Sequence, residues 1–281
     1  MSQQNQILHD VVQRAFVEAS RYENTRQDYP LEAVEFFLNN LGVKEIVTRD
    51  RPFKILEVGC GTGKFTRVML KVLELKEFKD IKVIASEPHQ NMYEEFKVVI
   101  PDTEIIQCTA EKIPLPDSSV DVVIAAQSFH WFANRAAVEE IHRVLAPSGS
   151  FGVIWSIEDT SVPWMKDLYE FMEHVYEQNS LVFPYKESWK TLFGGLCQQL
   201  FSAPKENLSF RHRFPFSVEQ AYEYFSSYSV IAGASEQTKK DLKESLDKVM
   251  EKHFKGNGIP LDHISFKIYL YWCTKTTSNS R

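Results

Sequence analysis

The segment FKILEVGCGTGKFT, residues 53–66, joins a short apolar run to a loop in which glycine stands at every second position. The run 53–58 predicts a buried strand, although it contains the acid Glu57, and residues 64–75 predict a helix. Three glycines lie between them: Gly59, Gly61 and Gly63. Glycine permits close approach of a ligand to the backbone, and a helix start offers unpaired N–H groups. The arrangement predicts a ligand-binding loop, the alternative being a glycine-rich turn without a ligand.

Strands and helices alternate on either side of this loop. Apolar runs predict further strands, at 81–87, 103–110, 120–128 and 151–157. Helical patterns separate them, at 64–75, 89–100 and 135–150. The spacing of apolar residues over 5–20 predicts an amphipathic helix. Two more strands, 210–217 and 264–273, close the chain, after helical patterns that begin near residue 163 and include the segment around 188–201. Apolar strands separated by helices are typical of parallel strands covered on both faces. The sequence therefore predicts an α/β fold with a doubly wound, mostly parallel, seven-stranded sheet and a helical insertion.

Composition narrows the classes of function. The chain has 281 residues and a formal net charge of −6, which disfavours a nucleic-acid footprint because that requires clustered positive charge. Its four cysteines lack CxxC spacing, so they predict free thiols in a reducing compartment and no metal site. The start of the chain lacks a secretory pattern, and no apolar run approaches the roughly 20 residues of a membrane helix. We expect a soluble, cytoplasmic protein without a membrane partner.

The spacing of the loop and its acids indicates which ligand it takes. The loop is G-x-G-x-G, which departs from the dinucleotide pattern G-x-G-x-x-G, and Phe65 stands where a phosphate loop needs Ser or Thr. Glu57 would repel a pyrophosphate and suits a cation. Glu87, at the end of the second strand, can accept hydrogen bonds from both hydroxyls of a ribose. Glu111 follows the third strand, where it could hold an exocyclic amine. Ammonium, ribose and adenine together describe S-adenosylmethionine.

These motifs carry a resemblance. ExGxGxG, Glu87, the stretch AEKIPLPDSSVDVVIAAQSFHWF (110–132) and a helix ending in LAPSG make the chain similar to class I S-adenosylmethionine-dependent methyltransferases. It most closely resembles the small-molecule branch, methyltransferase type 11, with trans-aconitate methyltransferase-like members. The core motifs span about 53–157, Tyr22 to Pro30 resembles that branch's N-terminal lid, and the C-terminal region matches in layout alone.

The resemblance implies a Rossmann-like methyltransferase fold in four parts. They are an N-terminal helical lid (1–45), a cofactor-binding core (46–158), a helical insertion over the acceptor pocket (159–208), and final strands and helices that complete the sheet (209–281).

The resemblance also implies the residues that bind S-adenosylmethionine. Glu57 would orient the loop and face the ammonium group, while Glu87 would hold the ribose. The other implied contacts are Gly59, Cys60, Gly61 and Gly63 along the methionine part, Pro88 and Met92 near adenine, Ala110 and Glu111 at the adenine edge, Ala126 and Gln127 beside the methionine moiety, and Tyr22 and Arg26 from the lid. For Tyr22 and Arg26, the alternative is a solvated surface segment.

Methyl transfer from a sulfonium is an in-line displacement, so the protein must align the acceptor and exclude water. His130, after the fourth strand, is the predicted general base, with a structural role in its loop as the alternative. The main prediction is transfer to a small-molecule acceptor. The alternatives are modification of RNA or protein and a non-catalytic S-adenosylmethionine-binding protein. Loop spacing and Glu57 argue against a dinucleotide oxidoreductase.

Overall fold

The computed structural model describes residues 19–43, 50–178, 197–255 and 260–276. The chain divides into two compact units, and each is described by itself. The helical unit comprises Met1–Gln27, Ile157–Lys186 and Arg211–Lys267. The sheet unit comprises Asp28–Ser156, Glu187–Phe210 and Ile268–Arg281. The four segments expected from the sequence remain a prediction.

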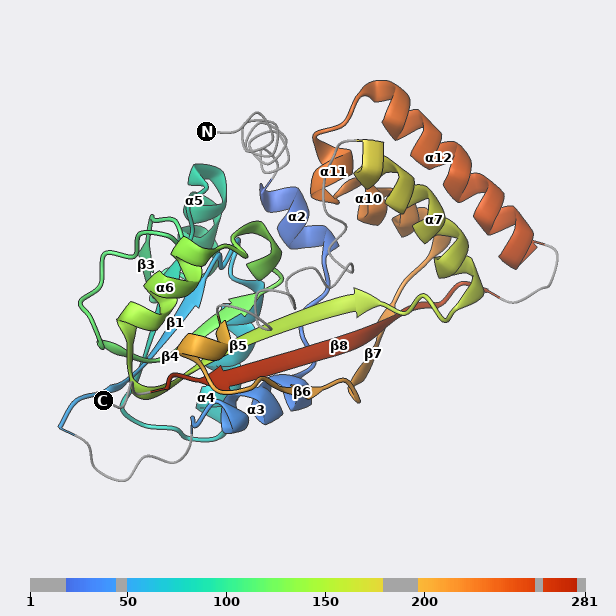
Figure 1. Ribbon diagram of the computed structural model, residues 1–281. Helices are drawn as coiled ribbons and strands as arrows, with labels where there is room; N and C mark the ends of the chain where they lie inside the picture. The colour runs from blue at the N-terminus through green and yellow to red at the C-terminus, as the bar shows by residue number, and fades with distance from the viewer. Residues whose placement is uncertain (1–18, 44–49, 179–196, 256–259, 277–281) are drawn as a thin grey trace. The chain divides into compact units, whose positions relative to one another are not determined.

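The sheet confirms the predicted doubly wound, mostly parallel architecture (Figure 1). Its parallel strands are β1 (Phe53–Val58), β2 (Ile81–Ser86), β3 (Glu104–Ile106), β4 (Val120–Ala126) and β5 (Leu145–Glu158). The last strand, β8 (His263–Thr274), pairs antiparallel with β6 (Lys205–Asn207) and, in the helical unit, with β7 (Arg211–Pro215). The order is β3-β2-β1-β4-β5-β8-β6, so the strand order reverses between β1 and β4.

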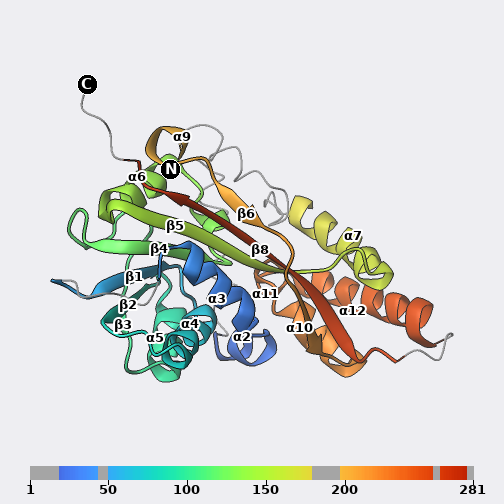
Figure 2. The same ribbon diagram turned by 90° about the horizontal axis from the view of Figure 1, so that it is seen from below.

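Continuous apolar sequence explains the central strands. All seven residues of β4 are buried, and in β1 only Lys54 is less than fully buried. Helices cover both faces: α3 (Leu31–Asn40), α4 (Lys64–Leu75) and α5 (Gln90–Val99) on one, and α6 (Arg135–Val144) and α9 (Cys197–Leu200) on the other (Figure 2). Burial on both faces removes the alternation of apolar and polar residues that a one-sided sheet would need.

One close approach between α3 and the sheet requires a glycine. A Cβ atom at Gly152, in β5, would lie 2.6 Å from Cζ of Phe37 and 2.8 Å from a Leu41 methyl group. The absence of a side chain at this position therefore lets α3 pack directly on β5.

The structure differs from the predicted elements in three places. The third strand is shorter than predicted, Glu104–Ile106 rather than 103–110, and β6 was not predicted, so the sheet has eight named strands instead of seven. The helix predicted over 135–150 ends at Val144, because the chain already enters β5 at Leu145. The helix predicted over 5–20 lies outside the described residues except near its end, as does most of the helical segment around 188–201.

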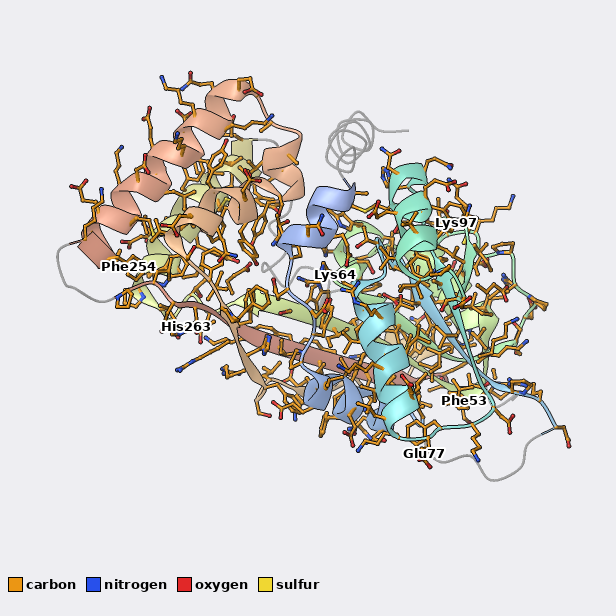
Figure 3. The ribbon with its side chains drawn as sticks, turned by 180° about the vertical axis from the view of Figure 1, so that it is seen from behind. Phe53, Lys64, Glu77, Lys97, Phe254 and His263 are labelled. Carbon is orange, nitrogen blue, oxygen red and sulfur yellow. The ribbon has the colours of Figure 1, made fainter. Side chains whose placement is uncertain are left out.

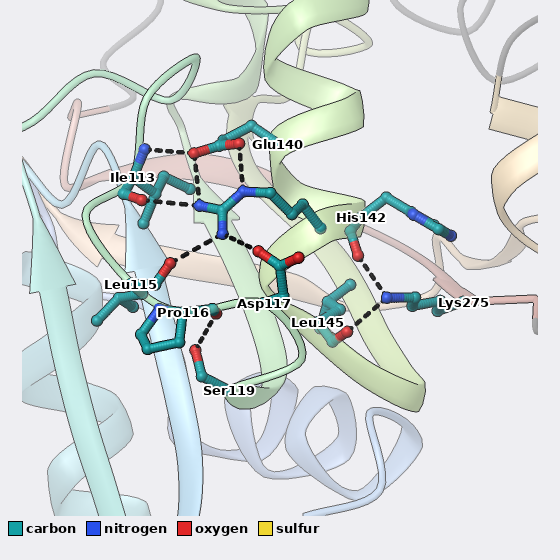
Figure 4. A network of polar contacts seen from close by, with 10 residues as sticks. Ile113, Leu115, Pro116, Asp117, Ser119, Glu140, His142, Leu145 and Lys275 are labelled. Carbon is teal, nitrogen blue, oxygen red and sulfur yellow. Dashed lines mark hydrogen bonds and ion pairs between the residues drawn. The ribbon is translucent and has the colours of Figure 1, made fainter.

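Side-chain bonds hold the loop that follows β3 where the predicted strand is missing. Arg143, in the last turn of α6, donates to the carbonyl oxygens of Ile113 and Leu115 and pairs with Glu140 and Asp117 (Figure 4). These carboxylates raise the pKa of Arg143, so the guanidinium stays charged. The loop is thereby tied to α6, and it begins at the segment that carries Ala110 and Glu111.

Lys275 completes the same end of α6. Its ammonium group donates to the carbonyl oxygens of His142, in the last turn of α6, and Leu145, the first residue of β5, each at 2.7 Å (Figure 4).

The helical unit contains α2 (Ala19–Thr25), α7 (Pro163–Gln178), α10 (Val218–Ser226), α11 (Ser229–Ala232) and α12 (Glu236–Met250), the last continuing as a π-helical turn, Glu251–Lys255. Asp167 of α7 pairs with Lys252 and His253 of that turn, and the Trp164 and Phe254 rings meet edge to face at 5.9 Å. No helix in the described ranges is long and apolar enough to cross a membrane.

Candidate functional site

The glycine loop leaves the carboxyl end of β1 at the point where the strand order reverses. Ligands of doubly wound sheets bind outside the carboxyl ends of the strands at such a point. Figure 3 shows Lys64 in the first turn of α4, at the end of the sheet unit away from Phe53 and Glu77. The loop is fixed to β2, because the N–H groups of Gly59 and Cys60 both donate to the carbonyl of Ser86.

The three loop glycines share left-handed backbone conformations but differ in their surroundings. A Cβ atom at Gly59 would lie 2.8 Å from Cβ of Ser128, and one at Gly63 would lie 2.5 Å from Cδ1 of Ile100. A Cβ atom at Gly61, where φ is +58°, would meet no atom of the described residues within 4 Å. Gly59 and Gly63 are therefore required by packing, and only Gly61 faces space that a ligand could use.

Glu87 lies directly beside that space. One of its carboxylate oxygens accepts from the N–H of Gly61 at 2.9 Å, and the other accepts from the N–H of His89 at 2.9 Å. Burial raises the pKa of Glu87 to about 7, against the opposing effect of the two N–H donors. Each oxygen keeps a lone pair for a further donor, so the carboxylate can accept two hydroxyl groups as predicted.

Glu57 is fully buried at the end of β1. One carboxylate oxygen accepts from the hydroxyl of Thr66 in α4 at 2.5 Å, and the other oxygen is buried with no hydrogen-bond partner among the described residues. Burial raises the pKa of Glu57 to about 8. A buried polar atom without a partner is costly, so this carboxylate needs a nearby cation or donor.

The two acids suit the cofactor that the sequence predicts. S-adenosylmethionine carries an ammonium group, a sulfonium and two ribose hydroxyls. The site offers two buried acids, Glu57 in β1 and Glu87, which bonds to the N–H of the open Gly61. Nothing about these residues favours a pyrophosphate. The donor set therefore fits a positively charged nucleoside.

The residues predicted around adenine lie on elements of the same unit. Met92, in the first turn of α5, is buried, and so is Ala110. Pro88 is exposed, as is Glu111. The carboxylate of Glu111 accepts from the side-chain amide of Asn134 at 2.8 Å, so its position is fixed by the cap of α6.

The loop after β4 carries the other predicted contacts. Ala126 is buried at the strand end, and Gln127 takes a left-handed φ of +52°. Gln127 bonds twice to β5: its N–H donates to the carbonyl of Ile154 and its side-chain amide to that of Ser156. This backbone turn leads directly into the 3₁₀ helix Phe129–Trp131 that carries the candidate base.

His130 has a buried Nδ1 atom for which the described part of the chain offers no hydrogen-bond partner. Burial lowers its pKa to about 4, so the imidazole is neutral at pH 7 and has a free lone pair. Its ring packs beside that of Trp131, with centroids 4.8 Å apart. The geometry is compatible with a proton acceptor.

Cys60 has a side chain that the sequence could not place. It is buried in a cluster with Ala85, Phe96 and Ile100. Burial raises the pKa of its thiol well above the ordinary value. Any contact of Cys60 with a ligand therefore has to come from its backbone.

The two lid residues lie in the helical unit. Arg26 is within 3.9 Å of the carboxylate of Glu158. The side chain of Tyr22, in α2, lies outside the described residues. Their predicted contacts with the cofactor remain predictions.

Two residues that sequence reasoning missed support the site. The hydroxyl of Ser128 donates to the carbonyl of Val58 at 2.7 Å, and so joins the loop after β4 to the end of β1. Thr66 holds Glu57. The spacing of Thr66, nine residues after the acid and on the first turns of a helix, was a usable signal; Ser128 gave none, because its partner is a backbone carbonyl.

Comparisons with known proteins identify the family of the chain. Residues 56–153 match the model of a protein family described as a methyltransferase domain. An uncharacterized methyltransferase of Schizosaccharomyces pombe is 32% identical over 237 residues, 82% of this chain and 84% of that protein. An uncharacterized methyltransferase of Mycobacterium tuberculosis is 32% identical over 151 residues, 54% of this chain and 55% of that protein.

Solved structures share the fold. The YcgJ protein of Bacillus subtilis superposes with a TM-score of 0.54 at 17% identity, over 88% of this chain and 99% of that one. A candidate type II methyltransferase from Anaeromyxobacter dehalogenans gives a TM-score of 0.58 at 20% identity, over 88% and 97%.

Proposed function

The chain belongs to the class I S-adenosylmethionine-dependent methyltransferases, and from that premise we propose that it methylates a small-molecule acceptor. The observation that carries the proposal is the pair of buried acids, Glu57 at the end of β1 and Glu87, which accepts from the N–H of the open Gly61. We retain the trans-aconitate methyltransferase-like branch and a cytoplasmic location as predictions of the same hypothesis.

In this proposal the loops bind S-adenosylmethionine. Glu87 accepts the ribose hydroxyls, Glu57 supplies the negative potential for the ammonium group, and the backbone at Gly61 contacts the methionine part. Met92 and Ala110 form apolar wall near adenine. When bound, the cofactor supplies a methyl group already activated by its sulfonium. The chain has to orient the acceptor and keep water out, and orientation of this kind can lower a barrier by roughly 7–11 kcal/mol.

His130 is the base in this proposal, for acceptors that arrive protonated. Its neutral imidazole accepts the proton, and Gln127 fixes the turn that carries it. A low pKa makes it a weak base, so the acceptor's own acidity has to assist. Exchange of His130 for Ala should slow turnover about 100-fold or more while cofactor affinity stays the same. Unchanged turnover in that variant would leave His130 with a structural role.

Charges beside the loop favour a small acceptor over nucleic acid. The two basic side chains at the start of α4, Lys64 and Arg67, lie 3.7 Å and 2.6 Å from the carboxylate of Asp28, which offsets one of their two positive charges. The net charge of −6 points in the same direction. A polynucleotide would need cations that remain available for its phosphates.

The testing experiment uses a radiolabelled methyl group. Purified protein and labelled S-adenosylmethionine are incubated with cell extract, which is then separated into small molecules, RNA and protein. The Glu87→Ala variant is the matched control. We expect label in the small-molecule fraction that depends on Glu87. Label in RNA or protein would favour the modification of a macromolecule, and cofactor binding without any label would favour a non-catalytic binding protein.

A further inference from the structure

The helical unit contains a polar cluster built around an acid to which the proposed methyl transfer gives no role. Its centre is Glu158, the last residue of β5, which is 3% exposed. Three tyrosine hydroxyls donate to its carboxylate: Tyr169 from α7, Tyr224 from α10 and Tyr228 just before α11. We call these four residues the Glu158 cage. All three rings are at most 9% exposed.

The cage holds a cation that belongs to the chain itself. The guanidinium carbon of Arg26 lies 4.0 Å from the centre of the Tyr228 ring and 4.7 Å from that of Tyr224. Its Nη1 atom lies 3.9 Å from the Glu158 carboxylate. Aromatic faces around a cation, with one buried carboxylate, are the usual construction of a site for an organic cation.

Stability alone does not account for this arrangement. Removing a carboxylate and a guanidinium from water costs several kcal/mol per ion, and apolar residues of similar volume are often as stable or more so. Burial raises the pKa of Tyr224 and Tyr228 well above the ordinary value, so both remain hydroxyl donors at neutral pH. The cluster therefore has a fixed preference for positive charge and against anions.

Arg26 is the member of the cluster that is nearest to solvent. Its side chain is 14% exposed, against 3% for Glu158. Arg26 is the residue immediately after α2, a helix of seven residues. The residues of the Glu158 cage belong to, or closely follow, other elements: β5, α7 and α10. Withdrawal of Arg26 would uncover the cage without disturbing the elements that build it.

We propose that the Glu158 cage is a binding site for a small organic cation, a guanidinium or alkylammonium group, and that Arg26 is its intramolecular occupant. An external cation competes with Arg26 for the same carboxylate and rings. The apparent affinity of the wild-type chain is then reduced by the fraction of molecules in which Arg26 is bound. This proposal is independent of the methyl-transfer function, since it requires neither cofactor nor turnover.

The experiment is calorimetric titration of the full chain with ethylguanidinium chloride, at constant ionic strength. N-ethylurea, which has the same shape without the charge, is the control ligand. We expect saturable binding to the wild type and at least tenfold tighter binding to Arg26→Ala. Glu158→Gln should lose binding at least tenfold. Arg135→Ala, an exposed arginine of α6 paired with Glu139, is the matched control and should bind like the wild type.

Two results would overturn the proposal. The first is the absence of saturable ethylguanidinium binding to the wild type, even if Arg26→Ala binds it. The cage would then bind only the guanidinium of Arg26. The second is equal binding of N-ethylurea. Should Arg26→Ala fail to fold with Glu158 left uncompensated, the comparison of wild type with Glu158→Gln decides the question.

Discussion

The chain surrounds the buried carboxylate of Glu158 with donors and a cation, but it gives those of Glu57 and Glu87 fewer donors. Glu158, in the helical unit, receives three tyrosine hydroxyls and a guanidinium. Within the part of the chain that the structure describes, Glu57, in the sheet unit, accepts from one hydroxyl and has one oxygen without a donor, and Glu87 accepts from two backbone N–H groups without a cation.

This difference distinguishes a buried acid whose counter-charge comes from the chain itself from one whose counter-charge would come from a ligand. Where the chain supplies the counter-charge, as at Glu158, the carboxylate lies beside a guanidinium and three hydroxyl donors. Where it does not, burial raises the pKa, to about 8 for Glu57 and about 7 for Glu87. Acids held in that condition at the carboxyl edge of a doubly wound sheet are candidates for a cationic ligand.

The sharpest way to break this comparison is to neutralise one acid of each kind. Glu158→Gln should lower the free energy of unfolding by about 3 kcal/mol or more, because it leaves the guanidinium of Arg26 buried without its counter-charge. Glu57→Gln should leave stability unchanged or raise it at pH 8, since it removes a charge that has no partner. Chemical denaturation of the ligand-free variants measures both, and equal losses would erase the distinction.

The pH dependence of stability tests the same point without mutation. The pKa of Glu57 is raised in the folded chain, so Glu57 holds a proton there that the unfolded chain releases above about pH 4.5. Its contribution to stability is complete below that pH and is lost as the pH rises toward 8. For such a group each pH unit in the window costs about 1.4 kcal/mol. Glu57→Gln should flatten the curve, and an equally steep curve in that variant would contradict the assignment.

The glycines extend the comparison from charge to space. Gly63→Ala should cost about 2–4 kcal/mol of stability, from its contacts with Ile100 and Phe96 together with its φ of +93°. Gly61→Ala has the backbone cost alone, about 1–2 kcal/mol, but it fills the open side of the loop and should weaken cofactor binding. Thermal unfolding and calorimetry separate the two effects. A Gly61 variant with full cofactor affinity would show that the space is not used.

A smaller effect is expected from removing Glu87, the carboxylate that we propose binds the ribose. Glu87→Ala should weaken binding of S-adenosylmethionine by at least about 1–2 kcal/mol, the scale of hydrogen bonds lost from a buried polar group. Glu94→Ala, an exposed acid of α5 bonded to Gln90 and Lys97, is the matched control. Affinity unchanged by Glu87→Ala would count against the site.

The sequence predicted the sheet unit well because its information is local. A fully buried parallel strand has a continuous apolar sequence. Glu57 and Glu87 could be recognised because they are acids that interrupt or end such strands. The length of β3 was overestimated because residues 107–110 belong to a loop and do not pair with a neighbouring strand. The distinct tasks of the three glycines could not be read, since they depend on Ser128 and Ile100, which are distant in sequence.

The Glu158 cage was equally invisible from the sequence. Its members come from positions 158, 169, 224 and 228, and Arg26 comes from a fifth segment. Tyrosines at helical spacing read as ordinary core, and nothing local indicates that their hydroxyls converge on one acid. Such clusters require tertiary structure, because partners separated by many residues leave no periodic pattern.

The central claim is that Glu57 and Glu87 form an acidic, glycine-lined site for a cationic nucleoside. Calorimetric titration with S-adenosylmethionine between pH 6 and 7.5, in buffers of different ionisation enthalpy, tests it directly. Because both acids are largely protonated at pH 6, a cationic ligand should release protons, and affinity should rise with pH. Binding that is absent, or that neither releases protons nor strengthens with pH, would contradict the account.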